Sequence, residues 1–232
     1  MSAPAAGEWR VRVGAEETSA VFEPALASSN GALFVFAHGA GGHMADRGVL
    51  GVSEHLRRGG FHVVRFNFLY RQKGFGRPDP MSRLKECITT VASHARREIG
   101  PKKLILGGRS MGGRTASMLA AEEFPCDGLL LLAYPLHPAG KLEELRDAHL
   151  EKINVPVLCL NGTRDALCRR DLMEHVVDRL TDRWTMHWLE GADHSFHVLK
   201  SSGRSDGEVL SEIAEASGTW VSSIAGTLGG ST

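Results

Sequence analysis

The sequence lacks several features that mark particular classes of protein. Its 27 basic and 27 acidic side chains give a formal net charge of zero, which argues against a strongly basic nucleic-acid-binding surface. Its most apolar run, residues 128–133, is far shorter than the roughly 20 residues of a membrane-spanning helix. The first 14 residues show no charged leader followed by an apolar core, so no signal peptide is expected. We therefore expect no nucleic-acid partner and no membrane segment.

Cysteine is scarce, and its four positions form no metal or redox motif. Cys87, Cys126, Cys159 and Cys168 contain no CxxC pair, so zinc and thioredoxin-type chemistry have little support. We expect mostly buried thiols in the reducing environment of the cytoplasm. A cytoplasmic protein that requires no metal and no organic cofactor is the resulting expectation.

Glycine, in contrast, is abundant, with 27 of the 232 residues against a usual share of about 7%. The length is one that α/β folds use for a single domain. The sequence shows no internal repeat, low-complexity segment or shift in composition. We expect one domain over residues 1–225, followed by a flexible tail at 226–232.

Short apolar runs alternate along the chain with helical patterns. This alternation predicts a parallel sheet with helices on both faces, and the first two runs indicate a hairpin that adds an antiparallel edge. Two irregular stretches, 69–80 and 135–148, follow strands at their carboxyl ends, where open α/β sheets bind ligands. The expected strands are 9–13, 19–22, 32–37, 62–66, 103–106, 129–133, 157–160 and 184–189, and the expected helices are 46–58, 81–99, 111–123, 169–180 and 208–224.

The strongest chemical signal is the segment KLILGGRSMGGRT at residues 103–115. A buried strand leads directly into GxSxG and then into a helix, which is the setting of a nucleophile elbow. Glycines flank Ser110 because a Cβ at those positions would collide with neighbouring backbone. The segment therefore predicts Ser110 as a nucleophile, although a glycine-rich turn with an inert serine gives the same pattern.

A P-loop is the competing interpretation of the same glycines, because residues 108–115 fit GxxxxG followed by Arg and Thr. The P-loop lysine supplies a compact charge to the phosphates. Here Arg114 occupies that place, and no acidic residue follows a buried strand in an obvious magnesium-binding position. The sequence favours the elbow.

A serine nucleophile needs a general base and an acid that orients it. In this setting the chain order is serine, acid, histidine. Asp165 follows the strand at 157–160, and His194 follows the strand at 184–189. We expect both to converge with Ser110 at one sheet edge.

Alternatives exist for both partners. His197 lies three residues after His194, but a tight turn at residues 191–193 favours presentation of His194. Asp171 lies inside an expected helix, and Asp193 is better suited to capping a turn than to pairing with the adjacent histidine.

Two backbone N–H groups are expected to stabilise a developing oxyanion. Met111 follows the nucleophile at the start of a helix. The second donor should come from the glycine-rich loop after the strand at 32–37, where Ala40 and Gly41 are equal candidates. His38, in the same loop, is expected to fix it by hydrogen bonding rather than to act as a base.

The motifs together resemble a known family. HGAGG, FNF, GGRSMGGR, YPLHP, NGTRD and GADHSF occur in this order, and the sequence over about residues 32–199 resembles the compact α/β-hydrolases related to dienelactone hydrolase. It is most similar to the branch that shares a hydrolase-like domain with a subunit of an animal chromatin-acetylating complex. The resemblance implies an α/β-hydrolase fold with a mostly parallel eight-stranded sheet and little or no lid. It also places Ser110, Asp165 and His194 on the catalytic positions, whereas dienelactone hydrolase itself has a cysteine nucleophile.

Substrate contacts are less clearly marked in the sequence. Arg71 lies in a basic loop at residues 70–77 and could attract an anionic group, although a solvated basic loop is the favoured interpretation. Arg109 beside the nucleophile could clamp an anion or brace neighbouring loops. Tyr134 and His137 are candidates for the pocket wall.

We expect a serine hydrolase of small acyl esters or thioesters that works through an acyl-enzyme. Two other hypotheses use the same scaffold. One is a non-catalytic interaction module, and the other is an acyltransferase or perhydrolase with an acceptor other than water.

Overall fold

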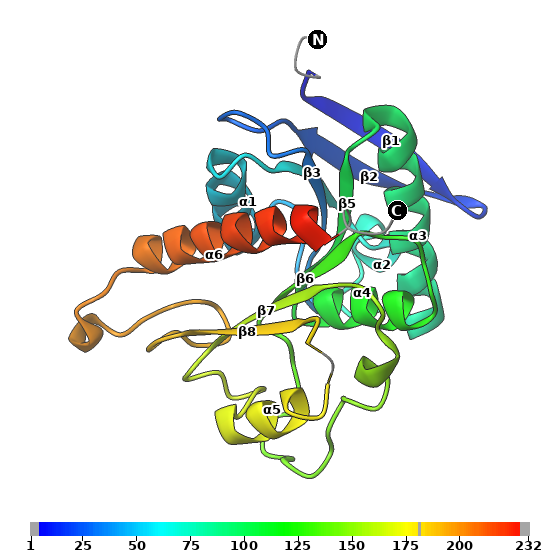
Figure 1. The fold of residues 1–232 in the computed structure, drawn as a ribbon. Coiled ribbons are helices and arrows are strands. Elements are labelled where there is room, and N and C mark those ends of the chain that lie inside the picture. Colours follow the sequence, from blue (N-terminus) through cyan, green and yellow to red (C-terminus); the bar gives the residue numbers. More distant parts are fainter. Residues whose placement is uncertain (1–4, 181, 228–232) are drawn as a thin grey trace.

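The protein is built on one eight-stranded sheet, seen in the computed structural model, which describes residues 5–180 and 182–227 (Figure 1). The strand order is β1-β2-β4-β3-β5-β6-β7-β8. β1 and β2 pair antiparallel, β2 pairs antiparallel with β4, and the remaining neighbours are parallel. Each of the eight expected runs forms a strand, so the predicted sheet is confirmed. The strands are β1 (Gly7–Val13), β2 (Glu16–Glu23), β3 (Ala32–Ala37), β4 (His62–Phe66), β5 (Lys103–Arg109), β6 (Gly128–Leu132), β7 (Val157–Gly162) and β8 (Trp184–Leu189).

Helices cover both faces of the sheet, and a separate apolar core lies under each face. α1 and α6 pack together on one face, while α3, α4 and α5 contribute to the core of the other. The central strands are buried on both faces because β3, β6 and β7 are apolar throughout most of their length. The helices are α1 (Arg47–Arg58), α2 (Leu69–Gln72), α3 (Met81–Ile99), α4 (Met111–Ala121), α5 (Arg170–Val177) and α6 (Asp206–Thr227), with short 3-10 turns at Leu150–Lys152 and Lys200–Ser202.

Four of the five expected helices differ from the structure at one or both ends, with α4 ending at Ala121 rather than at residue 123, and α2 was not expected. α2 lies within the stretch predicted to be irregular, where buried Leu69 and Tyr70 anchor a single turn. α5 ends at Val177 rather than at residue 180. α6 continues through Thr227, and the remaining part of the expected tail, residues 228–232, lies outside the described residues.

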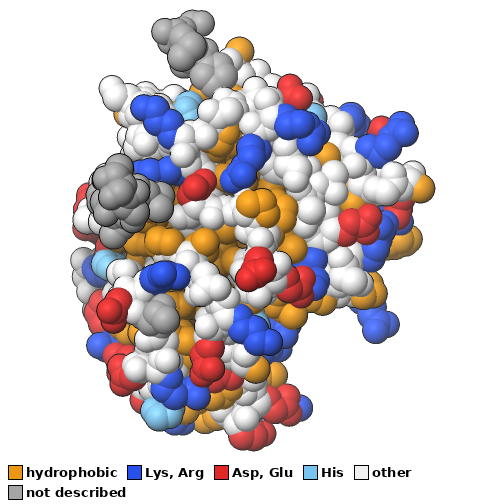
Figure 2. All heavy atoms as spheres, turned by 45° about the vertical axis from the view of Figure 1, so that its right-hand side comes forward, with side chains coloured by type: hydrophobic (Ala, Val, Ile, Leu, Met, Phe, Trp, Pro, Cys, Tyr) orange, Lys and Arg blue, Asp and Glu red, His pale blue; other side chains and the backbone are white. Residues whose placement is uncertain are grey.

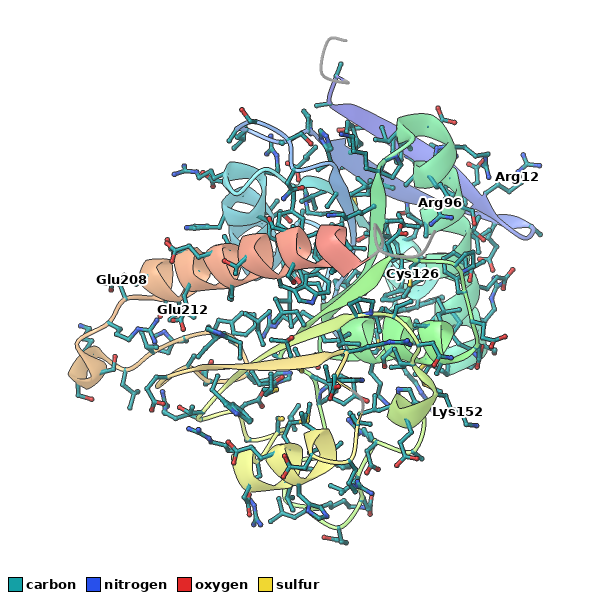
Figure 3. All side chains as sticks on the ribbon, in the orientation of Figure 1. Arg12, Arg96, Cys126, Lys152, Glu208 and Glu212 are labelled. Carbon is teal, nitrogen blue, oxygen red and sulfur yellow. The ribbon has the colours of Figure 1, made fainter. Side chains whose placement is uncertain are left out.

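Polar contacts fasten α6 to the edge of the sheet. In Figure 3, Glu208 and Glu212 lie along this helix, and Glu212 is on the side toward β8. There Glu212 Oε1 is 2.8 Å from His187 Nε2, and its other oxygen accepts from Arg204. The pairing joins the last helix to the last strand.

The distribution of surface charge and the state of the cysteines agree with what the sequence predicts. Figure 2 shows Lys and Arg interspersed with Asp and Glu around a central group of hydrophobic side chains. Cys87, Cys159 and Cys168 are buried free thiols, and Cys126 is half-buried in the loop before β6 (Figure 3), which confirms mostly buried thiols. Within residues 5–180 and 182–227, no helix has the length and apolarity needed to cross a membrane.

Strand register determines which loops meet at the carboxyl edge of the sheet. Ala37 of β3 pairs with Gly108 of β5, so the glycine-rich loop after β3 lies next to the turn after β5. Gly162 of β7 pairs with Leu189 of β8, so the loops after these two strands are also adjacent. The register therefore concentrates the predicted site residues at one edge.

Candidate active site

Ser110 occupies a sharp turn between β5 and α4. Its backbone angles are φ 53° and ψ −118°, a positive φ that non-glycine residues rarely adopt. Its N–H donates to the carbonyl of Leu132 at 2.9 Å, and it is the residue immediately before the first turn of α4. The hydroxyl is thereby held above the end of the strand.

The glycines around Ser110 allow the turn to approach β3 closely. A Cβ at Gly108 would lie 2.1 Å from the carbonyl oxygen of Ala37, and one at Gly112 would lie 2.2 Å from the same oxygen. Real Cβ atoms do not approach backbone this closely. The requirement for glycine here is therefore steric.

Ser110, His194 and Asp165 form one continuous hydrogen-bonded chain. His194 Nε2 lies 2.9 Å from Ser110 Oγ, and His194 Nδ1 lies 2.8 Å from Asp165 Oδ2. The imidazole is thus placed between a hydroxyl and a carboxylate, with one ring nitrogen facing each. This arrangement permits proton transfer from a serine to a histidine that a carboxylate holds in orientation.

Asp165 has a completely buried side chain whose oxygens are all bonded. Oδ1 accepts the Leu167 N–H at 2.8 Å, and Oδ2 accepts Nδ2 of Asn161 at 3.3 Å in addition to facing His194. These donors fix the direction of the carboxylate.

Asn161 is a functional neighbour that sequence reasoning missed. Its side chain accepts the Tyr134 N–H and donates to the Tyr134 carbonyl, both at 3.0 Å, and it also reaches Asp165. The signal in the sequence was a polar Asn next to the end of an otherwise apolar strand, β7. In the structure the amide of this residue is fully buried. A buried amide of this kind needs several partners, so it marks a local polar network.

The loop that carries His194 is organised by its neighbours. Asp193 Oδ1 accepts the N–H groups of Ser195 at 2.7 Å and His197 at 3.1 Å, so it stabilises the turn, as expected. Arg109 Nη2 donates to the His194 carbonyl at 3.1 Å and to Ser195 Oγ at 2.9 Å. The residue before the nucleophile therefore braces the histidine loop.

The alternative base and acid lie elsewhere. His197 Nδ1 pairs with the carboxylate of Asp206 at 3.0 Å. Asp171 pairs with Arg169 at 2.7 Å on the surface. Of the two candidate histidines, His194 is the one that reaches Ser110.

The glycine-rich loop after β3 is fixed by the buried His38. His38 Nδ1 donates to the Gly39 carbonyl at 2.8 Å, and Nε2 accepts the Phe68 N–H at 3.1 Å. Burial lowers the pKa of His38 to about 4, so the ring is neutral near pH 7. A neutral imidazole donates one hydrogen bond and accepts one, as these two contacts require. The expected anchoring role is consistent with these contacts.

Ala40 and Gly41 line the same cleft as Ser110 and His194, and Met111 begins α4 directly after the nucleophile. The backbone positions proposed for oxyanion binding are therefore brought to the nucleophile. Behind the loop, burial raises the pKa of the Tyr70 hydroxyl, and the neighbouring Gly41 backbone partly offsets this rise.

The cleft itself has a volume of about 450 Å³. Arg109, a candidate substrate contact from the sequence, lines the cleft, whereas Asp46, Val49 and Leu167 were not identified from the sequence. Within the described part of the chain, no group of three or more His, Cys, Asp and Glu residues could hold a metal ion. The lining residues are Gly39, Ala40, Gly41, Gly42, Asp46, Val49, Arg109, Ser110, Leu167 and His194.

Three predicted substrate contacts lie outside this lining. Tyr134 is fully buried, and its hydroxyl donates to the Arg146 carbonyl at 2.7 Å. His137 is also buried, with Nε2 accepting the Arg169 N–H at 3.1 Å. The loop after β6 folds inward, so both side chains are hydrogen-bonded inside the protein and do not line the cleft. Arg71 donates to the carbonyl of Phe75 within its own loop at 3.2 Å.

The arrangement of the chain is shared with solved structures. An α/β serine hydrolase homologue from Coxiella burnetii superposes with a TM-score of 0.74 at 20% identity, covering 90% of this chain and 96% of that one. A serine hydrolase without a lid from Xanthomonas campestris gives a TM-score of 0.74 at 20% identity, with coverages of 93% and 94%. Dienelactone hydrolase from Anabaena variabilis gives 0.71 at 18% identity, with coverages of 94% and 96%. These likenesses establish the predicted fold.

A family model provides the assignment at the level of sequence. The model described as the alpha/beta hydrolase domain matches residues 30–222, which span β3 to α6 and include all three members of the hydrogen-bonded chain. The protein therefore belongs to the α/β-hydrolase family.

Proposed function

We propose that the protein is a serine hydrolase that cleaves small acyl esters or thioesters. The observation that carries the proposal is the chain from Ser110 through His194 to Asp165, with links of 2.9 and 2.8 Å. Membership of the α/β-hydrolase family supports it. So does the resemblance of the motifs to the branch near dienelactone hydrolase, which remains a prediction at that finer level.

The first half of the reaction forms an acyl-enzyme. Ser110 Oγ attacks the substrate carbonyl carbon while His194 Nε2 removes the hydroxyl proton. The carbonyl oxygen becomes an oxyanion, which the Met111 N–H and an N–H of Ala40 or Gly41 stabilise. When the tetrahedral intermediate collapses, the protonated His194 gives its proton to the departing alcohol or thiol.

The second half regenerates the enzyme. Water enters, His194 removes one of its protons, and the resulting hydroxide equivalent attacks the acyl carbon. Collapse returns the proton to Ser110 Oγ and releases the carboxylic acid. Throughout both halves Asp165 holds the imidazole in the tautomer with hydrogen on Nδ1 and stabilises the imidazolium that forms.

The size of the cleft supports small substrates. A volume of about 450 Å³ is near the lower end of ligand pockets, and Gly39, Gly41 and Gly42 supply no bulky side chains to its wall. The physiological acyl group is then short or narrow, and binding requires no separate covering domain.

The test is turnover of p-nitrophenyl acetate by wild-type protein and by Ser110→Ala. The variant should lose hydrolysis while retaining its circular dichroism spectrum and its unfolding midpoint. Ser201→Ala, which removes an exposed hydroxyl in a short turn, is the matched control and should remain active. Undiminished turnover by Ser110→Ala would contradict the proposal.

Active-site labelling separates the alternatives. A fluorophosphonate should modify wild-type protein at Ser110 and leave Ser110→Ala unmodified. Folded wild-type protein that neither turns over esters nor labels would instead be an interaction module. Product analysis with competing alcohols, thiols or peroxide would reveal an acyltransferase or perhydrolase.

A further inference from the structure

A second cleft lies beside the candidate active site and shares a wall with it. Its volume is about 520 Å³. Arg109 lines both clefts, and the loop that carries His194 borders both, with His194 in the first and residues 195–197 in the second. The remaining walls come from the first turns of α1 and α6. The lining residues are Arg47, Gly48, Gly51, Arg109, Ser195, Phe196, His197, Asp206, Gly207 and Leu210.

Arg109 brings to this shared wall a cation that forms no direct ion pair with any described carboxylate. Its hydrogen bonds run from Nη2 to the His194 carbonyl and Ser195 Oγ, both uncharged acceptors. Its Nε is buried and has no partner, and no carboxylate of the described residues lies within ion-pair distance. Burial lowers the pKa of Arg109, and Asp193, Asp165 and Asp46 oppose this lowering from a longer distance.

Arg47 adds a second cation at the other side of the cleft. It is exposed, and among the described carboxylates none forms an ion pair with it. Arg47 and Arg109 therefore line the same cleft without a direct ion pair among the described residues, and Asp206 attracts Arg47 at longer range. Such a pair favours the binding of an anion.

The carboxylates near this cleft accept hydrogen bonds from other residues. Asp206 binds His197 Nδ1 and the Val198 N–H. Asp46 accepts the His43 N–H at 2.7 Å, and Asp193 accepts two N–H groups of the histidine loop. Among the residues that line the cleft, the two arginines outnumber the one carboxylate, Asp206.

Two glycines leave the α1 wall of the cleft open. A Cβ at Gly48 would lie 3.4 Å from Arg109 Nη1, and one at Gly51 would lie 3.2 Å from Leu210 Cδ1. Glycine inside a helix costs about 1 kcal/mol relative to alanine. Larger side chains here would press on the arginine and reduce the cleft, so the glycines preserve room for a bound group.

We propose that this cleft is the leaving-group subsite of the hydrolase, and that it accepts an alcohol or thiol bearing a carboxylate or phosphate. The proposal rests on the function proposed above. His194 must protonate the leaving group, so the leaving group lies on the side of the His194 loop. From there a group of modest length reaches the space between Arg109 and Arg47, with Leu210 beside its apolar part.

A matched pair of esters tests the inference. Benzyl acetate and 4-(acetoxymethyl)benzoate share the acyl group and differ by a carboxylate on the leaving group. Wild-type protein should prefer the anionic ester by roughly tenfold in kcat/KM, mainly through KM, and added potassium chloride should reduce the preference. Arg47→Ala should bring the ratio of the two kcat/KM values toward one. Arg58→Ala, at the other end of α1, should leave that ratio unchanged.

An equilibrium measurement keeps this test separate from catalysis. Ser110→Ala protein should bind the product 4-(hydroxymethyl)benzoate more tightly than benzyl alcohol by calorimetry, and Arg47→Ala in that background should remove the difference. Hydrolysis of neither ester would contradict the proposed function, while this binding difference would still support the subsite. Equal binding of the two alcohols, or a preference that Arg47→Ala does not change, would overturn the subsite.

Discussion

Arg109 precedes Ser110 in the chain, and its Nη2 donates to the carbonyl oxygen of His194 at 3.1 Å. A side chain of the nucleophile turn thus holds the backbone of the residue that accepts the nucleophile's proton. The contact joins β5 to the loop after β8 across 85 positions of sequence. It makes the Ser110–His194 distance depend on a side chain outside the three-residue chain itself.

Replacing Arg109 by Met should therefore reduce catalysis by a positioning effect. Methionine keeps much of the apolar stem but donates no hydrogen bond, so the His194 loop becomes less restrained. We expect kcat for p-nitrophenyl acetate to fall by roughly 10- to 100-fold. Arg170→Met, at an exposed position on α5, should keep wild-type kcat. A change confined to KM would show that Arg109 only contacts substrate.

Asp165→Asn should separate the orienting role of the carboxylate from its contribution to folding. The amide retains the size of the side chain, but it offers a donor in place of an anion beside His194 Nδ1 and favours the wrong tautomer. We expect kcat to fall by about 10³- to 10⁴-fold, measured in steady-state ester hydrolysis. Asp171→Asn on the surface is the control, and equal losses in the two variants would argue against Asp165 as the orienting acid.

Asn161→Ala should lower stability more than a typical polar substitution. The change leaves the buried N–H of Tyr134 without its acceptor, leaves the Tyr134 carbonyl with the Leu136 N–H alone, and removes a donor to Asp165. We expect the free energy of unfolding to decrease by about 3 kcal/mol, measured by urea denaturation. Asn154→Ala, at an exposed position, should change it by less than about 0.5 kcal/mol.

Glycine substitutions should act in opposite directions at two helical positions. At Gly112 a methyl group would meet the Ala37 carbonyl oxygen at 2.2 Å, whereas at Gly218 nothing lies within 4 Å. Gly112→Ala should destabilise the fold or displace the elbow and abolish ester turnover. Gly218→Ala should raise the free energy of unfolding by about 0.5–1 kcal/mol because alanine is the better helix former. Equal stabilities for the two variants would contradict the steric argument.

Short-range patterns were sufficient to predict the fold and the three principal side chains. The apolar runs gave the eight strands, and GxSxG between β5 and α4 identified Ser110. Asp165 and His194 could be selected because each follows a strand that the parallel order brings to the same edge. Local spacing carries this information because strand ends in a parallel sheet converge whatever the intervening loops contain.

The contacts missed from the sequence depend on long-range folding of the loops. Tyr134 and His137 suit a pocket wall by residue type, but the direction of the loop after β6 buries them both. Arg109 could be given either a bracing or an anion-binding role until its partners on the His194 loop were known. Asn161 required knowledge that Tyr134, in the loop after β6, lies beside it. In each case the deciding partner is distant in sequence and follows no periodic pattern.

The low pKa of His38 should make the folded protein less stable in mild acid. Its pKa is about 4 in the folded protein because burial disfavours the imidazolium, against about 6.5 for an exposed histidine. Between these values the unfolded chain binds the additional proton, so stability falls as the pH drops from about 6.5 to 4 and loses nothing further from this group below pH 4.

The gap between the two pKa values corresponds to about 3 kcal/mol of unfolding free energy. His38→Gln keeps an acceptor for the Phe68 N–H but does not titrate. Urea denaturation at a series of pH values should therefore show a smaller decrease in stability for this variant between pH 6.5 and 4, even if its stability at pH 7 is lower. His175→Gln, at an exposed position on α5, should retain the wild-type dependence. An unchanged decrease in His38→Gln would mean that the acid sensitivity arises from other groups, such as His149, whose pKa is also lowered to about 4 by burial and by Arg114.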